Sequence, residues 1–166
     1  MPIDTPLPPT STGSPAPDLT TYTTAEYAID LPASWKQIPS PESRAATFQT
    51  DDGRAGLFIS VDFYVIPPDK ARSTAERLIN SRLADHEKQA PGQVDMFHSG
   101  TQSHARGPGL EMYYAAHIAK EDVVMYLVYV MPSRVLNLTL VCKSDRAAAV
   151  ALFKGIHAHF RPKIAS

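Results

Sequence analysis

The sequence contains a single cysteine, no long apolar run and almost no net charge, and each of these scarcities excludes a class of protein. Cys142 has no second cysteine with which to form an intramolecular disulfide. No run approaches the ~18 consecutive apolar residues that indicate a membrane-spanning helix. The net charge of −1 provides no basic field for nucleic acid or for an acidic membrane surface. We therefore expect no nucleic-acid partner and no membrane span.

The first ten residues, MPIDTPLPPT, have neither the basic patch nor the apolar core of a secretory signal. Together with the lone thiol, this start favours the cytoplasm, or the periplasm if an export signal has been removed. Cys142 itself falls in the strand-like run LNLTLVC, where Leu136, Leu138 and Leu140 share its face. We therefore expect a buried cysteine rather than a reactive one.

The signatures of common catalytic sites are also missing. The sequence has no G-x-S-x-G elbow, no Walker-type glycine loop and no G-x-G-x-x-G. His98 and His104 stand six residues apart on one predicted strand, which separates them by roughly 20 Å. His157 and His159 point to different sides of a predicted helix. No histidine or cysteine cluster has zinc-ligand spacing either. From the missing motifs and the missing cluster together, we predict no catalytic residue, no metal and no cofactor.

What the chain does contain fits one domain behind a leader. At 166 residues it is close to the common domain size. Residues 1–20 hold six of the 15 prolines together with Ser and Thr, and they have almost no large apolar residue. Such a segment cannot bury enough surface to offset its ordering entropy. We predict a disordered Pro/Ser/Thr-rich leader over 1–20 and a single domain over 21–162.

The apolar pattern alternates between the period of strands and the period of helices. Strand-like runs cover 21–31, 35–38, 44–50 and 56–66, and the last is stopped by Pro67-Pro68. A helical stripe follows over Asp69–Gln89, where Ser73 and Glu76 have capping-box spacing. A polar strand is expected over 93–105, then three strands over 109–143, and then a final helix over 144–160 capped by Ser144.

The three strands over 109–143 are joined by short polar turns, so we expect them to form an antiparallel meander. Residues 123–130 are apolar on both alternating sets, which is typical of a central strand covered on both sides. The predicted fold class is therefore α+β, an α/β/α sandwich around a central antiparallel sheet. Its order is a strand-rich half, a helix, a three- or four-stranded meander and a second helix. Trp35, the only tryptophan, is expected to be buried where its ring packs the first strands against the sheet.

This order resembles the PsbP-like superfamily, which includes PsbP, the Mog proteins and bacterial proteins of the DcrB and EagR type. The residues that carry the resemblance are Tyr27-Ala28-Ile29-Asp30-Leu31-Pro32 followed closely by Trp35. It extends over roughly 22–160. It implies a PsbP-like fold and a non-catalytic protein-binding role. The EagR type implies an adaptor or chaperone for an apolar helix of an effector secreted by the type VI system.

Two functional hypotheses follow. The first is a protein-binding module whose partner lies against strand-borne polar and aromatic side chains, with a homodimer as a further option. The alternative is a small-ligand or hydrolytic site on Asp62, Glu111 and His117, which would line one cleft if their strands were neighbours. The candidate partner-binding residues are Asp62, Tyr64, Glu111, Tyr113, His117 and Tyr126.

Overall fold

The computed structural model describes residues 18–40, 44–103, 109–119 and 122–163. The strands of the main sheet are β3 (Lys36–Ile38), β4 (Ala45–Gln49), β5 (Ala55–Asp62), β6 (Val94–Ser103), β7 (Leu110–Ile118), β8 (Asp122–Val130) and β9 (Val135–Cys142). A smaller sheet consists of β1 (Leu19–Thr23), β2 (Tyr27–Pro32) and β10 (Phe160–Pro162). The helices are the short 3-10 turn η1 (Pro68–Lys70), α1 (Ala71–Gln89) and α2 (Arg146–Ala158).

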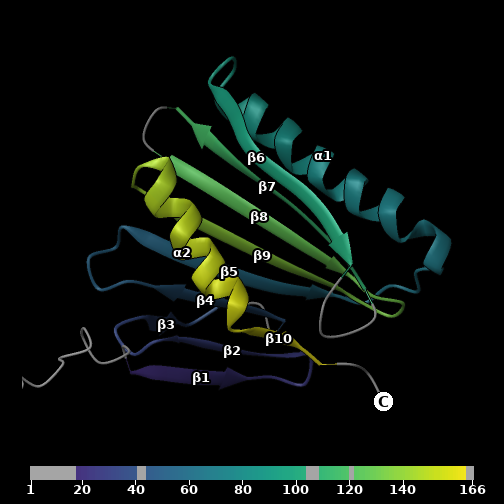
Figure 1. The fold of residues 1–166 in the computed structure, drawn as a ribbon, viewed down its shortest axis with the longest axis horizontal. Coiled ribbons are helices and arrows are strands. Elements are labelled where there is room, and N and C mark those ends of the chain that lie inside the picture. Colours follow the sequence, from purple (N-terminus) through teal and green to yellow (C-terminus); the bar gives the residue numbers. More distant parts are fainter. Residues whose placement is uncertain (1–17, 41–43, 104–108, 120–121, 164–166) are drawn as a thin grey trace, which may run out of the picture.

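The main sheet has the order β3-β4-β5-β9-β8-β7-β6, and every neighbouring pair is antiparallel. The predicted meander is confirmed as β7-β8-β9, because the turns between these strands are too short for a crossover. The front half joins the meander through the pairing of β5 with β9. This pairing places β8 near the centre and leaves β6 as the last strand (Figure 1).

The two helices cover opposite faces of this sheet, as the predicted α/β/α sandwich requires. Ala75 and Ile79 of α1 pack in one core cluster with Tyr114, Tyr126 and Val128. The other face carries a larger core cluster, to which α2 contributes Ala149, Phe153 and Ile156. Strand β8 supplies side chains to both clusters, which explains its two apolar faces in the sequence. Within the described ranges, neither helix combines the length and apolar character needed to span a bilayer.

The small sheet closes the α2 side of the molecule and differs from the prediction in two places. The run 21–31, predicted as one strand, is the hairpin of β1 and β2. Phe160, predicted as the end of the last helix, begins β10 and pairs with Ile29. It is nevertheless buried in the core of the α2 face. The first strand begins at Leu19, two residues before the expected domain boundary, and residues 1–17 of the predicted leader lie outside the described residues.

Two predicted helix caps are wrong by a few residues. The Ser73 hydroxyl donates to the Lys70 carbonyl from within the first turn of α1, so Ser73 does not begin that helix. At α2 the N-cap is Asp145, whose carboxylate accepts a hydrogen bond from the Ala148 amide at 2.8 Å. The stronger acceptor next to Ser144 takes this role because a carboxylate also interacts favourably with the helix dipole.

Two predictions about buried residues are confirmed. Trp35 is 4% exposed, and Cys142 is 3% exposed on the same face as Leu136, Leu138 and Leu140. Burial raises the pKa of the Cys142 thiol, which disfavours the reactive thiolate. The apolar alternation therefore identified the burial of Cys142, and the position after Leu31-Pro32 identified that of Trp35.

Candidate functional site

Helix α2 leaves part of its sheet face uncovered. It packs over β8 and β2, whereas β7 and β6 continue beyond it toward the edge of the sheet. Two adjoining cavities of about 180 and 440 Å³ lie between α2 and these strands. We call them together the α2–β6 groove. Their linings share His98, Val150 and Lys154, and the remaining lining residues are Phe97, Tyr113, Leu127, Arg146, Ala147, Ala151, Phe153 and His157.

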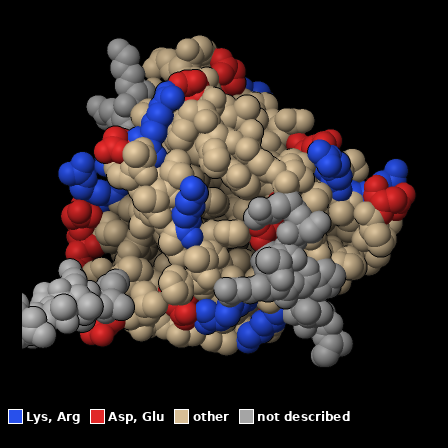
Figure 2. All heavy atoms as spheres, in the orientation of Figure 1, with Lys and Arg blue, Asp and Glu red and all other residues tan. Residues whose placement is uncertain are grey.

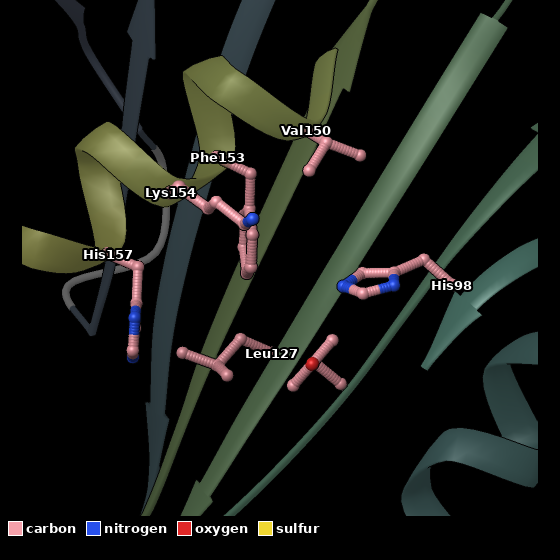
Figure 3. A pocket seen from close by; sticks show the side chains of 7 residues that line it. His98, Leu127, Val150, Phe153, Lys154 and His157 are labelled. Atoms are coloured by element: carbon pink, nitrogen blue, oxygen red, sulfur yellow. The ribbon is translucent and has the colours of Figure 1, made fainter. Parts of the chain in front are cut away.

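The figures show how the groove is built. In Figure 2 this face of the molecule is hollowed, and the surface around the hollow consists mostly of uncharged residues. In Figure 3 Val150, Phe153 and His157 extend from α2 toward the cavity. Leu127 rises from β8 beneath them, and His98 reaches in from β6 on the opposite side. The walls therefore come from α2 and β6, and the central strands form the floor.

Tyr113 forms much of the floor because its neighbour on β6 is a glycine. Gly100 pairs directly with Tyr113, and a Cβ placed on Gly100 would lie 2.5 Å from the Tyr113 hydroxyl oxygen. The tyrosine ring therefore lies across the glycine backbone. Its centroid is 5.2 Å from that of His98 and 6.3 Å from that of Phe153. The result is a row of aromatic rings from one wall of the groove to the other.

One end of the groove is held by a histidine and a buried carboxylate. Glu111 is 1% exposed, and its carboxylate lies 3.0 Å from Nε2 of His157 on α2. The His157 ring stacks on Phe153 with an interplanar angle of 10°. Glu111 also raises the pKa of Tyr129, to about 12, as a second cause after burial. The pair of Glu111 and His157 thus fixes the position of α2 above β7.

The other end is held by Arg146, which forms an ion pair with Asp95 of β6. Its guanidinium also lies 4.8 Å from the centroid of the Phe97 ring, in cation–π geometry. Lys154 stands between the two ends, and within the part of the chain that the structure describes it has no hydrogen-bond or ion-pair partner. Among the described residues, the lining of the groove is therefore largely aromatic and aliphatic, and Lys154 is its one lysine or arginine without a partner.

Three of the six predicted partner-binding residues lie in or behind this groove. Tyr113 lines it, and Glu111 orients His157, which also lines it. His117 lies behind the outer end, where its ring meets Phe97 edge-on at 5.5 Å. The Nε2 atom of His117 is buried and has no partner among the described residues. These three predicted residues therefore adjoin the groove from the strand side, and their role in binding a partner stays a prediction.

Asp62 and Tyr126 lie on the opposite face, under α1. Tyr126 donates a hydrogen bond to Asn137 at 2.5 Å, and Asn137 donates to Asp62 at 3.1 Å. The guanidinium of Arg82 on α1 lies 4.3 Å from the centroid of the Tyr126 ring. Burial raises the pKa of Tyr126 to about 12. Tyr126 and Asn137 are buried and Asp62 is half-buried, so the three form an internal network rather than an exposed surface. Tyr64, in contrast, is 56% exposed in the segment after β5.

The cleft of Asp62, Glu111 and His117 does not form. It required their strands to be neighbours, but β9 and β8 lie between β5 and β7. The residues also point to different faces. Asp62 pairs with Val135 and bonds Asn137 on the α1 side, whereas Glu111 bonds His157 on the α2 side. Among the described residues no group of three or more His, Cys, Asp or Glu side chains is placed to hold a metal ion, and His104 lies outside those residues.

The hydrogen bond between His86 of α1 and Tyr114 leads to a pH prediction. The Nε2 atom of His86 lies 2.7 Å from the Tyr114 hydroxyl oxygen, and burial, together with Arg82, lowers the pKa of His86. The unfolded chain, with a histidine pKa of about 6.5, binds this proton more readily. The free energy of unfolding should therefore fall as the pH decreases below that value.

His86→Gln should lose less of its free energy of unfolding than the wild type when urea denaturation is compared at about pH 7.5 and pH 5.5. Subtracting the loss in His86→Gln from the loss in the wild type cancels the contributions of the other five histidines, which both proteins share. Equal losses in the two proteins would show that His86 does not carry this dependence.

Comparison with known proteins identifies the fold. No family model and no curated protein matches the chain. Cyanobacterial PsbP (CyanoP) from Synechocystis sp. PCC 6803 superposes with a TM-score of 0.64 at 15% identity, over 91% of this chain and 96% of that one. The Ran-binding protein Mog1p of Saccharomyces cerevisiae gives 0.59 at 4% identity, over 88% and 96%. The chain therefore has the Mog1p/PsbP-like fold, which confirms the predicted resemblance at the level of structure.

Proposed function

We propose that this protein is a non-catalytic adaptor that holds a segment of a protein partner in the α2–β6 groove. The observation that carries the proposal is a continuous aromatic and aliphatic groove with one cation, Lys154, that has no partner in the described chain. Aromatic residues at the centre of a pocket and a charge at its rim are typical of protein-binding sites. Mog1p, which has the same fold, is a Ran-binding protein.

The absence of a catalytic role is part of the proposal. The three residues that best suited acid–base chemistry are divided between two faces of the sheet, so no nucleophile–base pair arises from them. The groove instead offers contact area, a row of rings and the charge of Lys154, which no described residue pairs with. In its finer form, taken from the resemblance to the EagR type, the proposal is an adaptor or chaperone for an apolar segment of an effector secreted by the type VI system.

Two adjacent alanines of α2 provide a matched test. Ala147 and Ala148 are both exposed, but Ala147 lines the groove and Ala148 lines a separate depression with Thr50 and Asp52. A photoreactive phenylalanine analogue at Ala147 should give a cross-linked adduct with a partner in cells of the source organism. The same analogue at Ala148 should not, because its side chain points away from the groove.

The readout is the adduct on a denaturing gel, followed by mass spectrometry of the joined peptides. Val150→Glu places a carboxylate on the groove wall and should abolish the adduct from Ala147 while the protein stays folded. Adducts of equal yield from both alanines, or no adduct from Ala147, would remove the groove as the binding site.

A further inference from the structure

We propose that the partner segment binds in an extended conformation, as a strand added to the free edge of β6, with an acidic side chain over Lys154. This inference rests on the proposed function and specifies the conformation and charge of the partner. It differs from docking of a helical segment, which the resemblance to the EagR type implies. The two modes engage different atoms of β6, so they can be separated by experiment.

Among the described residues, no strand lies along the outer edge of β6. Strand β6 is the last strand of the seven-stranded sheet and, within those residues, pairs with β7 alone (Figure 1). Across the described ranges, no residue of Val94–Ser103 makes a backbone hydrogen bond outside the strand ladder. The helix backbones lie closest to β7, β8 and β2, and α2 contacts β6 through the Arg146 side chain, which meets the side chains of Asp95 and Phe97 rather than the β6 backbone. A ten-residue strand therefore presents a row of backbone groups without partners from the described chain.

The register shows which groups point outward. The Ala119 amide donates to the Gln93 carbonyl just before β6, so Ala119 and the alternate residues of β7 direct their backbone groups toward β6. A bulge between Met96 and His98 shifts the register of β6 by one residue. Beyond it, His98 lies opposite Ala115 and Gly100 lies opposite Tyr113, and both of these β7 residues direct their backbone groups toward β6. The intervening residues of β6 therefore direct their N–H and C=O groups outward. These residues are Ser99, Thr101 and Ser103.

Residues 99–103 of this edge lack the features that usually prevent strand pairing. The opposite edge of the sheet, β3, has only three residues, begins with Lys36 and is followed by Pro39. Short length, lysine and proline all discourage the addition of a strand. In contrast, residues 99–103 of β6 read SGTQS, with neither a charge nor a proline, and the bulge lies outside them. Within the ranges that the structure describes, one edge of the sheet is therefore protected and residues 99–103 of the other edge are open.

The groove lies directly beside this open edge. In strand addition the backbone bonds provide affinity, and pockets for alternate side chains provide specificity. Side chains of an added strand on the α2 side would lie next to His98 and Gly100, where the groove opens toward Lys154. An aspartate or glutamate there would neutralise Lys154, and apolar neighbours would cover the ring of Tyr113. The one carboxylate of a second copy of β6, Asp95, is already paired with Arg146, so a second copy would bring no free acidic side chain to Lys154.

Thr101 allows the edge to be tested without disturbing the pairing of β6 with β7. Its side chain is exposed and its N–H points outward. Thr101→Pro removes that donor and blocks approach of another strand, whereas Thr101→Val keeps the N–H and has nearly the same shape. The probe is a linear 12-residue peptide enriched from a random phage-displayed library on the immobilised full chain. The enriched peptides should alternate apolar residues and share one acidic position.

Binding of the synthetic peptide, followed by fluorescence anisotropy, should weaken by about tenfold or more in Thr101→Pro and by less than about twofold in Thr101→Val. A second measurement uses the wild-type protein alone. N-methylation of one peptide amide at a time should abolish binding at every second position, since only alternate amides face β6.

Several results would overturn the inference. Equal binding by Thr101→Pro and Thr101→Val, or side-chain requirements that recur every three to four residues, would indicate helical docking in the groove and leave the proposed function standing. A dimer of the unliganded protein that is lost in Thr101→Pro but kept in Thr101→Val would assign the edge to a second copy. If the library yields no peptide whose binding depends on the α2–β6 groove, the proposed function is rejected as well.

Discussion

Replacement of Trp35 by alanine should lower the free energy of unfolding by about 3–5 kcal/mol, the usual cost of removing a large aromatic ring from a core. Trp35 is 4% exposed and belongs to the core cluster on the α2 face. Its amide donates to the Pro32 carbonyl at 2.9 Å, so the ring is positioned where β2 of the small sheet leads into β3 of the main sheet. Loss of the ring removes packing at the junction between the two sheets.

Urea denaturation of the wild type, Trp35→Ala and Trp35→Phe measures this effect. The phenylalanine variant retains much of the ring contact and should lie between the other two proteins. Because Trp35 is the only tryptophan, its native emission should also be blue-shifted relative to that of the unfolded chain. A loss below about 1 kcal/mol, which is within the range of ordinary surface substitutions, would show that the junction does not depend on this ring.

The sequence allowed the sheet to be predicted because its local signals agree with its tertiary structure. Strand β8 is apolar on both alternating sets, and it lies where each set meets one helix. The turns of the meander are short, so neighbouring strands had to be antiparallel. Where the local signal was weak, the prediction failed. The turn between β1 and β2 has no Gly, Pro or Asn, and it is made by the Thr24 hydroxyl, which accepts from the Glu26 and Tyr27 amides.

The candidate site was half predictable for a related reason. Alternation along β7 placed Glu111, Tyr113 and His117 on one face correctly. It did not show where β5 would join the sheet, because that is set by the long-range pairing of β5 with β9, which leaves β9 and β8 between β5 and β7. The groove also depends on where α2 ends its cover of the sheet. Lys154 and Val150 fall next to the apolar stripe of the last helix and carry no signal of their own.

The second large effect is expected at Asn137, in the network under α1. Asn137 is 3% exposed, accepts a hydrogen bond from the buried Tyr126 hydroxyl and donates one to Asp62. Asn137→Ala should lower the free energy of unfolding by about 2–4 kcal/mol, because each buried polar group left without a partner costs about 1–3 kcal/mol. Most of this cost should come from Tyr126, since Asp62 is only half-buried and retains access to water.

A double-mutant cycle can test that assignment. Tyr126→Phe removes the hydroxyl but keeps the ring beneath Arg82, so alone it should cost only about 0.5–1.5 kcal/mol. In that background Asn137→Ala no longer leaves a buried hydroxyl unpaired, and the double variant should lose less than the sum of the single losses by at least about 0.5 kcal/mol. Strictly additive losses would mean that the two side chains act independently and that the 2.5 Å hydrogen bond contributes little. A positive coupling would instead show that the sheet uses Asp62 and Tyr126 for stability beneath α1, on the face opposite the α2–β6 groove.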